Sequence, residues 1–220
     1  PGPRLMLNGH LDTKPFDGMT IDPTGAEVRD GKLWGRGACD MKSAVAAALV
    51  AAKAVQRSGA LRRGTLLVGG EVGEEGGGWT LRDLIDGPGT CDALICAEPT
   101  RLEVHVGCRG SYPLSVRTIG RATHTGTAYQ GVNAIEKMAT VIPALYALPA
   151  FQQADPVWDR VPINAEAISG GGLVSSSVPD RCDLKLDIRL NPWLTPEALG
   201  AQIDAAFARL RAADPDLHIE

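Results

Sequence analysis

Short apolar runs alternate with helical stretches through the first half of the chain. The pattern predicts strands over residues 4–8, 65–69 and 93–97, and helices over residues 41–57 and 79–85. Asp30-Gly31, which lies between two short strand patterns, is a typical two-residue hairpin turn. Because strands that alternate with helices form parallel sheets covered by those helices, we expect an α/β domain with a mostly parallel sheet.

The rhythm of apolar positions changes after residue 109. It predicts the order β-α-β-β-α-β, with elements over residues 112–119, 132–148, 162–169, 182–190, 196–212 and from 217 onward. Thr195 followed by Pro196 is a favourable helix start, with a side-chain N-cap and a proline in the first turn. This order is that of the ferredoxin-like split motif. We therefore expect two domains, an incomplete α/β domain over residues 1–109 and a ferredoxin-like domain over residues 110–220.

Composition and charge narrow the class of protein. The 220 residues carry a net charge of −4, with 22 basic residues spread among 26 acidic ones, which argues against a nucleic-acid partner. The longest apolar run, residues 44–52, is much shorter than the roughly 20 residues that cross a bilayer. Five cysteines without paired spacing favour a reducing cytoplasm. The chain opens on Pro1 without an initiator methionine and stops just inside a strand pattern, so we expect a piece of a longer gene product.

His10 and Asp12 come directly after the first predicted strand. Two residues apart in an extended segment, they point to one side, so that the Asp12 carboxylate can orient the His10 imidazole for metal binding. An isolated His-x-Asp is nevertheless more often a structural histidine at the end of a strand.

A glycine-rich loop, Gly35-Arg36-Gly37-Ala38-Cys39-Asp40, delivers Asp40 to the start of the predicted helix. A carboxylate at this place is commonly a plain helix cap. The two glycines that precede it imply a tight backbone path, which an ordinary cap does not require.

Further carboxylates follow the other two strands of the first half, Glu74 and Glu75 after one and Glu98 after the other. Adjacent carboxylates diverge at a strand end, so one can bind a metal while its neighbour takes a proton from water. Taken singly, each of these carboxylates could also be an ordinary acidic residue of an exposed loop. Because ligands bind at the carboxyl edge of parallel strands, the repetition predicts a metal site there.

Four motifs in this order, Gly-His-Leu-Asp-Thr, Gly-Arg-Gly-Ala-Cys-Asp-Met-Lys, Glu-Glu-Gly-Gly and Glu-Pro-Thr, resemble those of the co-catalytic zinc amidohydrolases. That family includes acetylornithine deacetylase, succinyl-diaminopimelate desuccinylase, aminoacylase and glutamate carboxypeptidase. The resemblance implies a zinc-peptidase-like fold and a metal-binding hydrolase, a deacetylase or metallopeptidase, with two zinc ions per full-length subunit and cobalt as a substitute.

The same resemblance implies a role for each acidic residue. His10, Asp40 and Glu98 would hold one zinc ion, and Asp40 would bridge to a second ion held also by Glu75. Glu74 would be the general base and Asp12 would orient His10. The resemblance also implies a cis peptide bond after Asp40.

The second half resembles the lid domain of that family, through Gly120-Arg121-Ala122-Thr123-His124 and Gly131-Val132-Asn133-Ala134. It implies a homodimer in which His124 crosses the interface to stabilise an oxyanion, and in which Asn133 contacts substrate. Arg189 resembles the arginine that binds a substrate carboxylate, although arginines on the polar face of a strand are usually only solvated.

This sequence departs from the family pattern in several places. Gly73 stands where the family often has Asp, and Glu71 leaves open which acidic residue is the base. The family's last zinc ligand is a downstream histidine, and His105 and His218, which we expect in strands, do not match it. We therefore expect this fragment to be inactive alone.

The leading hypothesis is a hydrolase that cleaves the amide bond of an N-acyl amino acid or a related peptide-like substrate through a zinc-activated water. One alternative is a non-catalytic dimerisation or binding fragment, in line with the missing histidine. Another is a thiol hydrolase that uses Cys39 and His10, which is disfavoured because Cys39 has no evident base and lies beside a carboxylate. The acyl group and the amino acid stay open.

Overall fold

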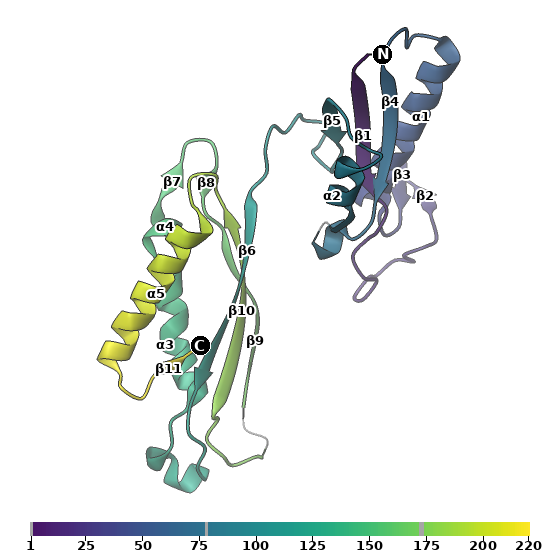
Figure 1. Cartoon of the computed structure of the whole chain (residues 1–220). Coiled ribbons are helices and arrows are strands. Elements are labelled where there is room, and N and C mark those ends of the chain that lie inside the picture. The colour runs from purple at the N-terminus through teal and green to yellow at the C-terminus, as the bar shows by residue number, and fades with distance from the viewer. Residues whose placement is uncertain (1, 78, 172–173) are drawn as a thin grey trace. The chain divides into compact units, whose positions relative to one another are not determined.

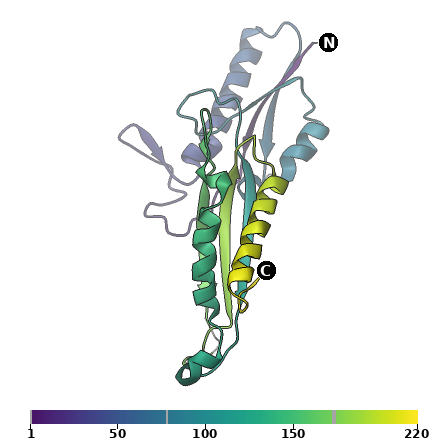
Figure 2. The ribbon, with the colours of Figure 1, turned by 90° about the vertical axis from the view of Figure 1, so that its left-hand side faces the viewer.

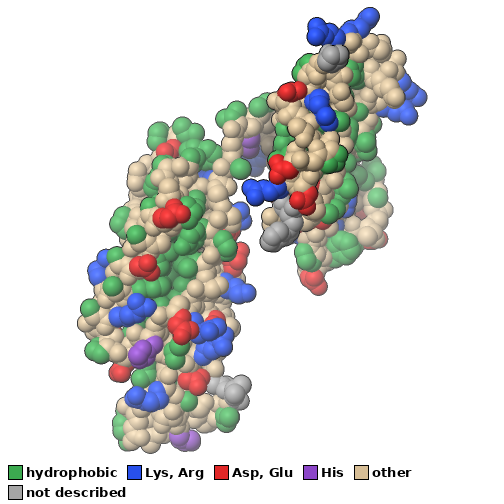
Figure 3. All heavy atoms as spheres, viewed as in Figure 1, with side chains coloured by type: hydrophobic (Ala, Val, Ile, Leu, Met, Phe, Trp, Pro, Cys, Tyr) green, Lys and Arg blue, Asp and Glu red, His purple; other side chains and the backbone are tan. Residues whose placement is uncertain are grey.

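The computed structural model describes residues 2–77, 79–171 and 174–220 (Figure 1). The chain divides into two compact units, Pro1–His105 and Val106–Glu220, whereas the sequence pattern changes at residues 109 and 110. No helix among the described residues combines the length and the apolar character needed to cross a bilayer. On the face drawn in Figure 3, acidic and basic side chains are interspersed over both units.

The first unit contains a three-stranded parallel sheet, as the alternating pattern predicts. β1 (Arg4–His10) lies between β4 (Thr65–Glu71) and β5 (Ala93–Cys96) and pairs with both in parallel. Because all three strands run the same way, their carboxyl ends meet at one edge of the sheet.

Two helices cover opposite faces of this sheet (Figure 1). A Cβ at Gly9 would lie 2.9 Å from Val45 of α1 (Ser43–Ser58), whereas one at Gly69 would lie 3.1 Å from Leu84 of α2 (Trp79–Asp86). Gly69 is paired with Asn8 and therefore lies on the same face of the sheet as Asn8. Gly9 follows Asn8 along β1 and lies on the opposite face, because side chains alternate along a strand. The glycines thus allow each helix to approach the sheet closely.

The predicted hairpin is also present, formed by β2 (Glu27–Arg29) and β3 (Lys32–Trp34). Its two turn residues, Asp30 and Gly31, have φ angles of 52° and 70°. A type I′ turn requires positive φ at both central positions, which explains the Asp-Gly pair.

The first helix differs from the prediction at its start. α1 begins at Ser43, and Ala38–Lys42 form a separate kinked turn in which Asp40 has non-helical angles. The peptide bond between Asp40 and Met41 is cis, as the family resemblance implies. Asp40 does not cap this helix: Lys42 is the residue at the N-cap, and no side chain makes a capping hydrogen bond there.

The second unit is an antiparallel sheet in the order β11-β6-β10-β9. Its strands are β6 (Gly110–Ile119), β9 (Ile163–Gly170), β10 (Arg181–Leu190) and β11 (His218–Ile219). α3 (Ala134–Tyr146) and α5 (Pro196–Ala213) lie side by side on one face (Figure 2). This arrangement is the predicted β-α-β-β-α-β split motif.

The core of the second unit lies between this sheet and its helices. Alternate residues of β10 are buried, so that Leu184, Leu186 and Ile188 are at most 1% exposed and belong to one buried cluster with Met138 and Leu199. The pattern does not predict α4 (Pro149–Gln152) or the small ladder of β7 (Ala154–Asp155) and β8 (Asp159–Arg160). These elements are too short to give a detectable period.

Candidate metal centre

The candidate site lies at the carboxyl edge of the parallel sheet. His10 is the last residue of β1, Glu74 and Glu75 begin the short turn after β4, and Glu98 follows β5. Asp40 approaches from the kinked turn before α1. The structure thus brings all five residues to one edge, although they come from four separate segments of the chain.

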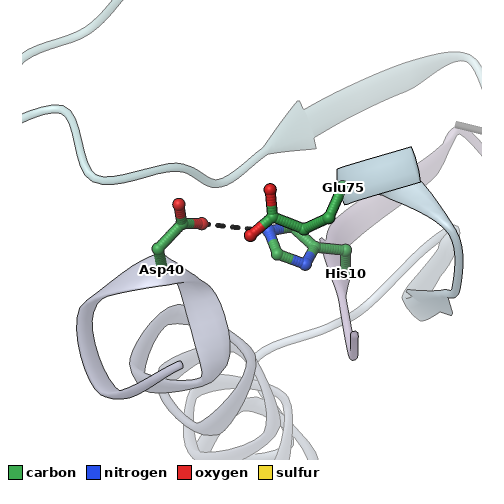
Figure 4. A group of neighbouring side chains, drawn as sticks. All are labelled: His10, Asp40 and Glu75. Atoms are coloured by element: carbon green, nitrogen blue, oxygen red, sulfur yellow. Dashed lines mark hydrogen bonds and ion pairs between the residues drawn. The ribbon is translucent and has the colours of Figure 1, made fainter. Parts of the chain in front are cut away.

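Two overlapping groups of side chains share the His10 imidazole. Its Nε2 lies 3.0 Å from Asp40 Oδ1, and Figure 4 shows the Asp40 and Glu75 carboxylates converging on the ring. Ligand atoms of His10, Asp40 and Glu75 lie within 4.8 Å of one another, as do those of His10, Glu74 and Glu98. Imidazole nitrogen and carboxylate oxygens at such separations are a donor set that suits zinc.

Asp12 supports two of these residues. Its main-chain carbonyl lies 3.0 Å from His10 Nδ1, while its carboxylate Oδ1 lies 3.5 Å away. Its other carboxylate oxygen accepts a hydrogen bond of 3.2 Å from the main-chain amide of Glu75. We expected the carboxylate to orient His10; the shorter contact comes from the carbonyl of Asp12, which lies in the loop after β1.

The charges at the site are crowded. Burial, followed by the negative charges of Asp40 and Glu74, raises the pKa of Glu98. Burial alone would lower the pKa of His10, but its hydrogen bonds with Asp40 and with the Asp12 carbonyl raise it above 6.5. Several carboxylates around one imidazole are a cluster that a bound cation would relieve, so the residues present fit a divalent metal ion.

The kinked turn is held against β1 by tight packing. The main-chain amide of His10 donates to Met41 Sδ at 3.3 Å, and Met41 is 1% exposed. A Cβ at Gly9 would lie 2.4 Å from Met41 Cε and 2.9 Å from Val45 Cγ2, so a larger residue there would displace these side chains. This packing fixes Asp40 opposite His10.

Glu71 lies behind the site rather than in it. It is 3% exposed and accepts a hydrogen bond of 2.7 Å from Asn8 Nδ2. Glu74 Oε2, in contrast, lies 4.0 Å from His10 Nε2. Of the two acidic residues that the sequence left open as the base, Glu74 is the one beside the imidazole.

The three candidate residues of the second unit are each engaged locally. His124 Nδ1 accepts from the Gly126 amide at 3.0 Å. The Asn133 side chain caps α3 by accepting from the amides of Ile135 and Glu136. Arg189, whose side chain is 53% exposed, pairs with Asp187 at 2.8 Å.

The remaining histidines only partly follow the prediction. His218 lies in β11, as expected, but His105 lies in an irregular segment. One further residue, which the sequence did not single out, reaches the site: Lys14 Nζ lies 2.9 Å from Glu75 Oε2.

Comparisons with known proteins identify the family. The sequence profile of peptidase family M20/M25/M40 matches residues 6–219. The succinyl-diaminopimelate desuccinylase of Rhodospirillum centenum is 31% identical over 217 residues, which cover 92% of this chain and 55% of that protein. That of Dechloromonas aromatica is 32% identical over 222 residues, 94% of this chain and 58% of that protein. The chain therefore spans little more than half the length of these curated relatives.

Solved structures share the fold at low identity. An M20 family metallo-carboxypeptidase from Sulfolobus solfataricus has a TM-score of 0.70 at 15% identity, over 99% of this chain and 63% of that one. Human carnosine dipeptidase 1 has a TM-score of 0.68 at 17% identity, over 100% and 60%. With a family profile that matches almost from end to end, the resemblance carried by the four motifs is confirmed, and this chain belongs to peptidase family M20/M25/M40.

Proposed function

We propose that the chain carries the metal site of a zinc-dependent amidohydrolase that acts on an N-acyl amino acid or a related small peptide-like substrate. The observation that supports this is the convergence of the His10 imidazole with the carboxylates of Asp40, Glu75 and Glu98 at one sheet edge. The curated relative is named as a desuccinylase, and the two solved structures are named as a dipeptidase and a metallo-carboxypeptidase. Each of these three names describes the hydrolysis of an amide bond.

In this proposal His10, Asp40, Glu75 and Glu98 would hold a pair of zinc ions. When bound, the ions supply Lewis acidity, which activates water and polarises the scissile carbonyl at neutral pH. The Asp12 carbonyl keeps a proton on His10 Nδ1, because a carbonyl oxygen can only accept. His10 Nε2 is thereby kept available on the side of Asp40.

Glu74 acts as the general base. It stands next to the proposed ligands, with its Oε2 at 4.0 Å from His10 Nε2, and its side chain is 42% exposed. A carboxylate there can take a proton from the attacking water and return it to the leaving nitrogen. Its neighbour Glu75 serves as a metal ligand in this proposal, because its side chain is largely enclosed, with 13% exposure.

The second unit serves as the lid and dimerisation domain of a cytoplasmic homodimer. His124 of one subunit stabilises the oxyanion formed in the site of the other, and Asn133 contacts the substrate. Arg189 binds a substrate carboxylate and releases its present partner Asp187 when it does so. A planar guanidinium suits this task because it can make two parallel hydrogen bonds.

The test uses the whole protein with a panel of N-acetyl, N-succinyl and N-formyl amino acids. We expect turnover of at least one member, loss of turnover on removal of metal by a chelator, and recovery on addition of zinc. The Cys39→Ala variant should remain active. Turnover that survives the chelator and is lost in Cys39→Ala would instead identify a thiol hydrolase. The present 220 residues alone should show no turnover.

A further inference from the structure

Lys14 engages the carboxylate of Glu75 from two sides. Its ammonium Nζ lies 2.9 Å from Glu75 Oε2 and donates to the Glu75 carbonyl at 2.9 Å. Its main-chain amide donates to Glu75 Oε1 at 3.2 Å. Both carboxylate oxygens of this candidate metal ligand therefore already have a donor from the same residue.

The two contacts can be separated by substitution. The main-chain hydrogen bond remains when the Lys14 side chain is replaced, so it continues to orient Glu75. The ammonium contributes the positive charge, which a lysine side chain carries at neutral pH. An ammonium has no lone pair and cannot itself bind a metal.

A divalent ion at Glu75 has to share this carboxylate with a cation or displace it. Like charges at such short range repel each other. The Lys14 side chain is 59% exposed, so solvent and salt reduce this repulsion without removing it. The lysine side chain can also swing away into solvent, which leaves the ligand free at a cost in affinity.

We propose that Lys14 tunes the metal affinity of the candidate centre by pairing with Glu75, so that a divalent metal held by Glu75 is bound more weakly than the donor set alone would bind it. Lys14 acts through Glu75 and is a positioning residue. The inference rests on the proposed function, since it requires that these side chains bind a metal.

The test measures the zinc affinity of the full chain by competition with a chromophoric chelator. Lys14→Met keeps the apolar stem and removes the charge, and we expect it to bind zinc roughly two- to tenfold more tightly, a factor typical of one exposed ion pair or somewhat more. Lys14→Arg keeps the charge and should bind like the parent. Lys53→Met, which removes an exposed lysine from α1, is the matched control for net charge and should change nothing.

A double-mutant cycle shows whether the effect passes through Glu75. In a Glu75→Gln background, Lys14→Met should give no gain in zinc affinity. Equal or weaker binding by Lys14→Met, or a gain that persists without the Glu75 carboxylate, overturns the inference and leaves the proposed function intact. If neither the parent nor any variant binds zinc, the inference and the proposed function both fail.

Discussion

The main-chain carbonyl of Asp12 lies 3.0 Å from His10 Nδ1, closer than the carboxylate of the same residue at 3.5 Å. The contact requires a proton on Nδ1, because a carbonyl oxygen only accepts hydrogen bonds. The orientation of the imidazole is therefore set mainly by the backbone at residue 12. The carboxylate has a second task, which is to accept the main-chain amide of Glu75.

Replacing Asp12 should consequently have a mild effect on metal binding. Loss of a residue that orients a metal ligand typically costs 10- to 100-fold in affinity, and we expect Asp12→Ala to cost roughly tenfold or less, because the carbonyl remains. Asp12→Asn keeps an oxygen that can accept the Glu75 amide and should bind zinc more like the parent. Chelator competition measures both. A loss beyond 100-fold in both variants would show that the carboxylate itself is the main support or a ligand.

Glu74→Gln in the whole protein separates a general base from a ligand. We expect turnover to fall by roughly 10²- to 10⁴-fold, the range attributed to general base catalysis, with zinc content unchanged. Glu74 also has an oxygen within 4.8 Å of possible ligand atoms of His10 and Glu98, so the three side chains could share a metal ion. Zinc analysis of the purified variant therefore decides between the roles, and loss of zinc together with turnover would make Glu74 a ligand.

The parts of the fold that the sequence predicted have local causes. Apolar runs that alternate with helical periods specify the parallel sheet, and the Asp30-Gly31 pair specifies a hairpin turn because few residues accept positive φ. The kinked turn Ala38–Lys42 has no such signal. The apolar pattern is continuous from Met41 onward, and the helix starts later because Met41 is buried against β1, a contact between segments distant in sequence.

The same distinction holds for the candidate site. Acidic residues at the ends of successive strands could be placed together from the sequence, since parallel strands end at one edge. The role of the Asp12 carbonyl could not, because every residue has a carbonyl and only the path of the backbone selects one. Lys14 is a single lysine in a loop, and its contact with Glu75 becomes apparent only when β1 and β4 lie side by side.

Glu98 should oppose the stability of the metal-free chain. Its pKa is raised by burial and then by neighbouring carboxylates, so the folded chain holds its proton more tightly than the unfolded chain. The ionised form therefore destabilises the fold fully above the raised pKa and not at all below the ordinary value near 4.5.

We accordingly expect Glu98→Gln to raise the melting temperature of the metal-free chain at pH 7 and to have little effect at a pH below 4.5. The same variant should bind zinc at least tenfold more weakly, since it removes a ligand. Thermal unfolding with a chelator present measures the first effect, and chelator competition the second. Lower stability at pH 7 would show that the carboxylate makes a favourable contact that outweighs the crowding.

The proposed shared site predicts complementation between inactive subunits of the whole protein. His124→Ala and Glu74→Ala should each be inactive alone. After subunit exchange, one of the two sites in a heterodimer would contain both intact residues, so about a quarter to a half of the parent activity should return, depending on the fraction of heterodimer. Exchange is verified with differently tagged subunits, and absence of recovery after verified exchange rules out a His124 that acts across the interface.

The ion pair of Lys137 with Asp214 predicts a pH-dependent contribution to the stability of the second unit. It joins α3 to the C-cap of α5, and the hydrogen bond from Lys137 lowers the pKa of Asp214. A lowered pKa means that the pair stabilises the fold above the ordinary value near 3.8 and that this stabilisation disappears as the pH falls through the lowered value.

Because both side chains are partly exposed, at 21% and 36%, we expect Lys137→Met to lower the free energy of unfolding at pH 7 by only about 0.2–1 kcal/mol. Urea unfolding at pH 7 and in acid measures the difference, with Lys137→Arg as the variant that keeps the charge. A deficit of the same size at both pH values would mean that the lysine stem contributes through packing instead of through its charge.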